Sequence, residues 1–260
     1  MASRRQADET PKMKSLYWAL NLLDYFDDQH KNRGVSELAE LTGLPKSSVC
    51  NALSTFEQCG FLRKRSTTGK YALAPKVVCL SYAYSAVNDD AIAFQKECRI
   101  ISDRLDAIVH VGALVDHKVI YLACTYPARY PQEAMIGKPI PMHCTAVGKA
   151  VLAFLPPEEQ QRVLSSPLPA CTANTITDPE ALRLELEKIR RQDYAVDNME
   201  SDSSMRSVAI PLHHLGHKDA MARYAISVTM PYTRMPEESV LEYVKIIQDT
   251  HREFTSSFLK

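Results

Sequence analysis

The 260-residue sequence lacks the features of several broad classes of protein. No stretch approaches the length and apolar character of a membrane span, and the polar N-terminal residues contain no apolar signal core. The catalytic patterns G-x-S-x-G, H-E-x-x-H and the P-loop are absent as well. These absences disfavour a membrane protein, a secreted protein and the enzymes that carry those motifs, and we expect a cytoplasmic location.

The sequence also lacks a cysteine pattern of a disulfide scaffold. Its seven cysteines stand at positions 50, 59, 79, 98, 124, 144 and 171, so their number is odd and no C-x-x-C pair occurs. Several lie in apolar helical segments, where cysteine behaves as a small hydrophobic residue. This usage favours a reducing compartment.

The formal net charge of the chain is zero, but its charged residues are unevenly distributed. Residues 1–88 contain 12 Lys and Arg against 8 Asp and Glu, whereas the remainder contains 19 against 23. A mildly basic N-terminal part joined to a mildly acidic remainder fits a DNA-binding module attached to a sensor or an enzyme.

Residues 34–73 have the layout of a winged helix-turn-helix, a module that reads DNA. Ser36 is predicted to N-cap a short helix, which Gly43 ends because glycine is the usual residue just past a helix end. Pro45 suits the first turn of a second helix. Three apolar residues of that helix fall at i, i+4 and i+7 and predict one buried stripe: Val49, Leu53 and Phe56.

The opposite side of the second helix, from Lys46 to Gln58, is polar and has little steric bulk. Small hydroxyls, an amide and a lysine can reach phosphates and base edges in a major groove. Asn51 is the best single candidate for a base contact, because an amide can pair bidentately with adenine.

A basic hairpin follows this helix. Two short strand-like runs, 61–65 and 70–73, flank a turn at 66–69 and gather positive charge, as phosphate contact requires. DNA contacts are therefore expected from Ser36, Lys46, Ser47, Ser48, Asn51, Thr55, Arg63, Lys64, Arg65 and Lys70.

The rest of the chain predicts an α+β body. Before the helix-turn-helix, residues 1–11 resemble a disordered leader and residues 12–29 an amphipathic helix. Residues 75–88 predict a helix that is apolar on more than one side, so it must pack against the body or a second chain. Beyond it, strands in hairpins with helices at both ends suggest an antiparallel sheet.

These residues resemble the IclR family of bacterial transcriptional regulators from Lys14 onward. The resemblance is carried by SLYWALNLLDYF, ELAELTGLPKSSV, CGFLRK and GKYAL in the first part, and by PMHCTAVGKAVLAFL and AISVTMP in the body. It implies a winged helix-turn-helix DNA-binding domain at 12–74, a linker helix at 75–88 and a GAF-like effector-binding domain at 89–260. It further implies a homodimer or tetramer that binds pseudo-palindromic promoter DNA and senses a small carboxylic or aromatic metabolite, without a cofactor.

The resemblance also implies an effector pocket. The residues that match it are Thr145, Ala146, Gly148 and Asp197, and Ser207 stands at a pocket position where this sequence departs from the family. Ser227 and Thr229 alternate on one face of a strand, where two hydroxyls can point at one ligand. A helix N-terminus with a hydroxyl and backbone amides is a ready anion site. The alternative interpretations are a simple N-cap for Thr145, a solvated strand-end residue for Asp197 and ordinary strand residues for the serine and threonine. The family usually has cysteine where Ser207 stands and glycine where Ser204 stands, so the ligand can differ, and Asn51 replaces a frequent arginine.

Two other functions compete with this interpretation. One is a metal-dependent or hydrolytic enzyme with an accessory DNA-binding part, because His and Cys are good zinc ligands. The candidate ligands are His213, His214, His217, His143 and Cys144; the first three surround a turn at Gly216, where a solvated loop is the better interpretation and no metal is expected. The other is a purely structural DNA-binding protein, which a separate body with its own sheet disfavours.

Overall fold

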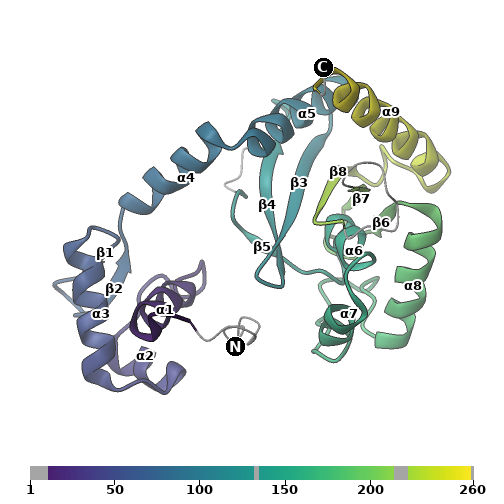
Figure 1. Ribbon diagram of the computed structural model, residues 1–260. Coiled ribbons are helices and arrows are strands. Elements are labelled where there is room, and N and C mark those ends of the chain that lie inside the picture. Colours follow the sequence, from purple (N-terminus) through teal and green to yellow (C-terminus); the bar gives the residue numbers. More distant parts are fainter. Residues whose placement is uncertain (1–10, 132–134, 214–221, 259–260) are drawn as a thin grey trace. The chain divides into compact units, whose positions relative to one another are not determined.

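The computed structural model describes residues 11–131, 135–213 and 222–258, so most of the expected leader lies outside the described residues. The chain divides into two compact units, Met1–Asn88 and Asp89–Lys260 (Figure 1). Together they have the predicted α+β composition, with a helix-turn-helix in the first unit and an antiparallel sheet in the second.

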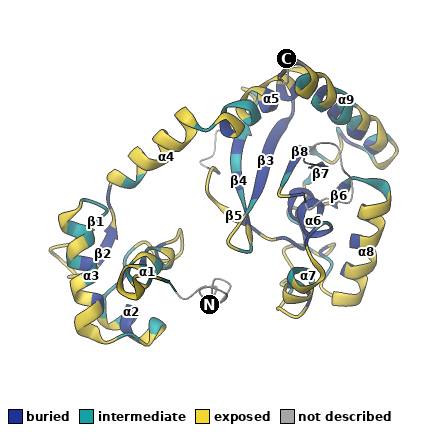
Figure 2. Ribbon diagram, in the orientation of Figure 1, coloured by how far each residue is buried: buried dark blue, intermediate teal, exposed yellow. Residues whose placement is uncertain are grey.

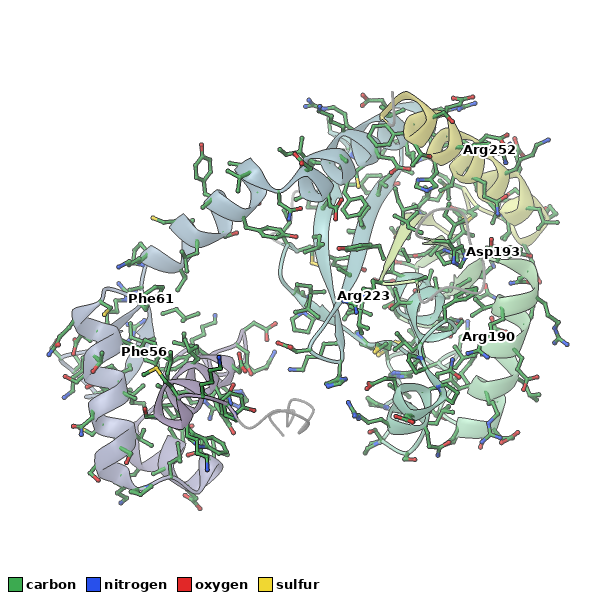
Figure 3. All side chains as sticks on the ribbon, in the orientation of Figure 1. Phe56, Phe61, Arg190, Asp193, Arg223 and Arg252 are labelled. Atoms are coloured by element: carbon green, nitrogen blue, oxygen red, sulfur yellow. The ribbon has the colours of Figure 1, made fainter. Side chains whose placement is uncertain are left out.

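The first unit contains five helices and one hairpin in its described part. In order they are α1 (Lys14–Asn21), the 3-10 helix η1 (Leu22–Tyr25), α2 (Val35–Thr42), α3 (Lys46–Gln58), β1 (Leu62–Lys64), β2 (Tyr71–Leu73) and α4 (Lys76–Val87). Leu22, Leu38, Val49, Leu53 and Leu62 are buried in its core. The predicted stripe of α3 is confirmed at Val49 and Leu53, while the ring of Phe56 is half-buried and lies edge-on to Phe61 (Figure 3).

The first helix is shorter than the expected 12–29. It tightens into η1 and ends at Tyr25, and Leu16 of α1 is half exposed. Asp27 accounts for the early end, because its carboxylate accepts hydrogen bonds from the backbone amides of Gln29 at 3.0 Å and His30 at 2.6 Å. Such a local turn competes with continuation of the helix.

The prediction that Ser36 caps α2 is wrong. The N-cap is Gly34, whose amide donates to the Glu37 carboxylate at 3.2 Å, and Ser36 is an exposed residue in the first turn. Arg33 holds Glu37 in this position through an ion pair. The predicted end of α2 is confirmed, since Gly43 adopts φ 72° there.

The second unit is built on a six-stranded antiparallel sheet in the order β5-β4-β3-β8-β7-β6. Its strands are β3 (Ile108–Val115), β4 (Lys118–Thr125), β5 (Pro139–Ile140), β6 (Ala195–Asn198), β7 (Met205–Leu212) and β8 (Tyr224–Pro231). Its helices are α5 (Asp89–Leu105), α6 (Ala146–Leu152), α7 (Pro157–Leu164), α8 (Pro179–Gln192), η3 (Glu237–Ser239) and α9 (Val240–Phe258).

The two faces of this sheet are covered by different helices (Figure 1). α5 and α9 cover one face, where Ile226, Val228 and Met230 of β8 point into an apolar core. α6 and α8 cover the other, where Ala225 of β8 belongs to a second core. Because side chains alternate along a strand, Ser227 and Thr229 lie on the α6 face.

α6 ends at Leu152, although the next proline that could stop it is Pro156. The carbonyls near its end are taken by side chains instead of by further helix: Gln160 donates to Leu152, Ala153 and Leu155, and Arg190 of α8 donates to Ala153 (Figure 3). Because these carbonyls have hydrogen-bond partners, the helix can end without a glycine in the left-handed conformation. Among the described residues no helix is both long and apolar enough to cross a membrane.

Candidate functional site

The outward side of α3 is polar and exposed. Lys46, Ser47, Ser48, Asn51 and Thr55 are all exposed, and Figure 2 shows this helix largely in the colour of exposed residues. The Thr55 hydroxyl donates to the Asn51 carbonyl at 2.8 Å, so it can only accept from a ligand, whereas the Asn51 side chain is exposed. This surface therefore presents an amide, two serine hydroxyls and a lysine in one row.

The hairpin places positive charge beside α3. Arg63, Lys64, Arg65 and Lys70 are all exposed. The Arg65 side chain donates to Asn32 at 2.5 Å, and Lys70 lies 3.5 Å from Glu37.

Glu37 offsets part of the charge of the hairpin. The hydrogen bond from Arg33 lowers the pKa of this carboxyl, so it stays charged beside Lys70. Arg63 and Lys64 are thus the stronger phosphate candidates, and the amide of Lys64 ties the hairpin to α3 through Glu57 at 3.0 Å.

The second unit contains a cavity of about 520 Å³ between the sheet and the start of α6. Six of the seven expected pocket residues line it: Thr145, Ala146, Asp197, Ser207, Ser227 and Thr229. Strand register explains why residues so far apart in sequence meet here. Asp197 of β6 pairs with Ser207 of β7, which pairs with Thr229 of β8, so the three lie in one row across the sheet.

The hydroxyls in this row are arranged for a polar ligand. Ser207 Oγ and Thr229 Oγ1 lie 2.9 Å apart and share a hydrogen bond, and Ser227, which is 2% exposed, lies two residues along the same face. The Ser207 hydroxyl can donate to or accept from a ligand while it is bonded to Thr229.

Thr145 is the N-cap of α6, which was the alternative to a direct ligand contact in the sequence analysis. Its hydroxyl accepts from the Gly148 amide at 3.1 Å and donates to the Pro141 carbonyl at 2.7 Å. The amides of Ala146 and Val147 come before the first intrahelical bond, from Lys149 to Thr145, and both residues line the cavity. Backbone amides, and not the Thr145 hydroxyl, are the groups of this helix end suited to a ligand.

Gly148 does not line the cavity. A Cβ at this position would lie 2.6 Å from the Met142 Cα and 2.6 Å from the Pro141 carbonyl oxygen. Glycine is therefore required for close packing of α6 on the preceding segment. This residue shapes the cavity wall without reaching the space inside.

Asp197 is not the solvated strand-end residue of the alternative interpretation, since it is only 2% exposed. Its carboxylate accepts from the amides of Glu200 at 2.7 Å and Ser201 at 3.2 Å, and from the Ser201 hydroxyl. Burial raises the pKa of Asp197, and these hydrogen bonds oppose the rise. The carboxylate organises residues 198–201, of which Ser201 lines the cavity.

Sequence reasoning missed the aromatic lining of the cavity. His110 of β3 stacks on Tyr121 with ring centroids 4.3 Å apart, its Nε2 lies 3.3 Å from the Tyr126 hydroxyl, and Tyr130 also lines the space. Burial lowers the pKa of His110 to about 4, so the imidazole is neutral at pH 7. The pairing of His110 with Ser227 across β3 and β8 brings it to the pocket.

The candidate metal ligands have other partners. His143 Nε2 binds the Pro169 carbonyl at 3.0 Å, and Cys144 Sγ lies 3.6 Å from Cys171 Sγ. His213 binds Asp193 at 2.8 Å (Figure 3), while His214 and His217 lie outside the described residues. In the part of the chain that the structure describes, no three His, Cys, Asp or Glu side chains form a group that could hold a metal ion.

The two sites together define a class of protein. One unit presents an exposed polar helix beside a basic hairpin, which suits a major groove and its phosphates. The other holds a cavity with converging hydroxyls, amides and aromatic rings, which suits a small molecule. This is the organisation of a DNA-binding transcriptional regulator with an effector domain.

Comparison with known proteins identifies the family. Residues 15–66 match the IclR helix-turn-helix domain, and residues 88–255 match the bacterial transcriptional regulator IclR C-terminal domain. The chain belongs to the IclR family of transcriptional regulators.

Relatives of this chain match it over most of its length. The HTH-type transcriptional regulator Rv1719 of Mycobacterium tuberculosis is 30% identical over 236 residues, covering 90% of this chain and 88% of that protein. An IclR family regulator from Brucella abortus has a TM-score of 0.80 at 21% identity, covering 98% and 96% of the two chains. An IclR homologue from Microbacterium hydrocarbonoxydans, complexed with 4-hydroxybenzoate, has a TM-score of 0.69 at 20% identity, covering 94% and 100%.

Proposed function

We propose that this regulator reads promoter DNA with α3 and holds the phosphates with the β1–β2 hairpin. The proposal rests on the exposed row of Lys46, Ser47, Ser48, Asn51 and Thr55, flanked by the exposed Arg63 and Lys64. Asn51 would contact a base and the basic side chains would contact phosphates, the usual division between specificity and positioning. Residues 12–74 would form the DNA-binding domain, and residues 89–260 the effector domain.

The functional protein would be a homodimer or a tetramer on pseudo-palindromic DNA. The support is α4, the linker helix of the proposal, whose residues are all exposed except for Val77 (Figure 2). Its exposed side chains include Val78, Leu80, Tyr82, Tyr84 and Val87. An apolar surface of this kind marks a protein contact, and a second copy of α4 would cover it.

A small metabolite with a carboxylic or an aromatic group would occupy the cavity and control DNA binding. The observation that carries this proposal is the row Asp197, Ser207 and Thr229, which lines the same cavity as the rings of His110 and Tyr121. A volume of about 520 Å³ lies in the range of small-molecule sites and has room for a single-ring ligand. None of the described lining residues is a lysine or arginine, so a carboxylate would be held by backbone amides and hydroxyls.

The relative complexed with 4-hydroxybenzoate supports the aromatic class, because such a ligand combines one ring, one hydroxyl and one carboxylate. Binding, and not turnover, would be the task of the cavity, as in a regulator. A protein that binds promoter DNA would work in the cytoplasm, where bacterial DNA lies.

The test combines ligand binding with DNA binding. Thermal-shift screening of the full chain against 4-hydroxybenzoate and related acids should raise the Tm for a true effector, because a ligand that binds only the native state stabilises it. The same compound should change operator affinity at fixed salt and be recovered unchanged by mass spectrometry. Thr229→Val should weaken its binding, while Thr255→Val on the exposed side of α9 should not.

Unchanged operator affinity with a bound ligand would exclude control through the cavity. Consumption of the compound would instead indicate an enzyme.

A further inference from the structure

Two cysteines of the second unit lie in contact although 27 positions separate them. Cys144 immediately precedes Thr145, the N-cap of α6, and is fully buried. Cys171 lies in the irregular segment 165–178 and is exposed. Their sulfur atoms are 3.6 Å apart, the distance of a thiol–thiol hydrogen bond.

The backbone around both cysteines is held in place by separate contacts. His143 Nε2 binds the Pro169 carbonyl at 3.0 Å, two residues from Cys171. The amide of Cys171 donates to Thr175 Oγ1 at 3.0 Å. Both thiols are therefore presented to each other by fixed segments, and side-chain rotation is the main change needed for the sulfur atoms to reach the bonding distance of about 2.05 Å.

We propose that Cys144 and Cys171 form a reversible disulfide when the protein meets a peroxide. The exposed Cys171 reacts first: its sulfur takes an oxygen atom from hydrogen peroxide, giving a sulfenic acid and one water. Cys144 then attacks this sulfur, and the leaving hydroxide combines with the thiol proton as a second water. Two thiols are oxidised to one disulfide while one peroxide is reduced, and a reducing dithiol restores both thiols by exchange.

The different surroundings of the two sulfur atoms set this order. Burial raises the pKa of Cys144, so this thiol is a poor first target for peroxide. Cys171 is reachable from solvent, and its partner already waits at 3.6 Å. Proximity lets Cys144 capture the sulfenic acid before further oxidation.

The disulfide would lie between two walls of the cavity. On one side, Cys144 adjoins Thr145, which lines the cavity. On the other side, Thr172 Oγ1 donates to the Met199 carbonyl and Thr175 Oγ1 to the Glu200 carbonyl, both at 2.7 Å. The bond would therefore tie the start of α6 to the segment that the Asp197 carboxylate organises, and oxidation would rigidify the cavity.

The first experiment maps the bond in the full chain. After treatment with hydrogen peroxide, digestion without reductant should yield one peptide pair joining Cys144 to Cys171, two hydrogens lighter than the free peptides, and a dithiol should separate it. Oxidation should raise the Tm of this unit by about 5–10 °C. Cys171→Ser should abolish both effects, and Cys59→Ser, at an exposed cysteine of the first unit, should retain them.

The proposal is overturned if Cys171 ends as a sulfinic acid, stays reduced, or links to a second copy of the chain. The test uses Cys171→Ser because Cys171 is exposed, so this substitution should not disturb folding. A substitution of the buried Cys144, such as Cys144→Ala, is therefore not needed.

A second experiment measures the link to the cavity without any ligand. Hydrogen exchange should slow in residues 197–201 of the oxidised protein relative to the reduced protein, and remain the same in Cys171→Ser under both conditions. Equal exchange in the oxidised and reduced wild-type protein would overturn the coupling. Neither experiment depends on the effector or on DNA, so its outcome is independent of the proposed function.

Discussion

Lys149 Nζ and Glu200 Oε1 lie 2.5 Å apart in a place where neither side chain reaches solvent to any extent. Lys149 belongs to α6 and Glu200 to the segment after β6. The pair therefore connects two segments that each contribute residues to the cavity lining. Burial raises the pKa of Glu200, and the Lys149 ammonium opposes this rise. Lys149 is thus the partner of a buried carboxylate that burial alone would make costly.

Breaking this pair should destabilise the second unit strongly. Lys149→Met leaves a buried carboxylate without its partner and should lower the free energy of unfolding by about 3–5 kcal/mol. The second change Glu200→Gln should recover part of the loss, because it removes the unpaired charge. Urea unfolding followed by circular dichroism measures both.

Lys188→Met is the matched control for Lys149→Met. Lys188 is 59% exposed and lies 3.7 Å from Glu185 on the same helix, so its loss should cost less than about 1 kcal/mol. If the two substitutions lowered the free energy of unfolding equally, the buried ion pair of Lys149 would stabilise the protein no more than the exposed pair of Lys188 does.

The stability of the protein should fall in mildly acidic solution because of His110. Its imidazole is neutral in the fold with a pKa of about 4, against 6.5 in the unfolded chain. As pH falls from 6.5 towards 4, the unfolded chain gains this proton first, so the native state loses up to about 3 kcal/mol. Asp197 and Glu200, whose pKa values are raised, act in the opposite sense as pH falls.

His110→Gln should flatten this part of the stability curve, measured as urea midpoints between pH 7 and pH 4. If the wild type and His110→Gln lost the same stability over this range, the burial of a neutral His110 would not be the cause.

Gly148→Ala should disturb the cavity without touching its interior. The added Cβ would lie 2.6 Å from backbone atoms of Pro141 and Met142, which cannot move independently of α6. We expect destabilisation of about 1–3 kcal/mol, as for other overpacked sites. Gly34→Ala is the control, since the nearest atom to its Cβ, in the Lys70 side chain, is 3.9 Å away. A thermal shift compares the two, and equal Tm values would contradict the packing argument.

Local patterns in the sequence predicted the parts of this protein that depend on neighbours in the chain. The stripe at Val49 and Leu53, the glycine end of α2 and the strands of the body all follow from spacing and turn residues. The alternation of Ser227 and Thr229 correctly placed both hydroxyls on one face.

Features that depend on distant pairing could not be predicted in this way. His110 stands in an apolar strand, and only the pairing of β3 with β4 and β8 gives it Tyr121 and Ser227 as neighbours. Burial of Asp197 similarly requires residues 198–201 to fold over it. The cap of α2 was missed for a local reason, since Arg33 positions Glu37 to cap from Gly34.

The exposed apolar surface of α4 should be needed for assembly. Tyr82→Asp places a charge on a side chain that is 75% exposed in the single chain, so the fold should persist while association is lost. Light scattering should report a monomer, and operator affinity should fall by about 100-fold with the loss of paired binding.

Leu184→Asp provides the comparison for assembly, because Leu184 of α8 is an apolar residue exposed to 59% in the second unit. It should keep the oligomeric state of the wild type. A dimeric Tyr82→Asp protein would place the contact between copies elsewhere.

Asn51 and Arg63 should affect DNA binding in different ways. Asn51→Ala removes an amide suited to adenine, so it should cost about 1–3 kcal/mol on the operator, relax specificity at one base pair and leave the salt dependence unchanged. Arg63→Ala removes a phosphate contact, so it should weaken binding to operator and random duplex alike and reduce the salt slope by about one ion. Titrations at two salt concentrations with both duplexes separate the two effects.

Gln58→Ala, at the exposed end of the same helix, should behave as the wild type. If Asn51→Ala weakened binding to both duplexes equally, Asn51 would contact the backbone, and the bases would have to be read by Ser47, Ser48 or Thr55.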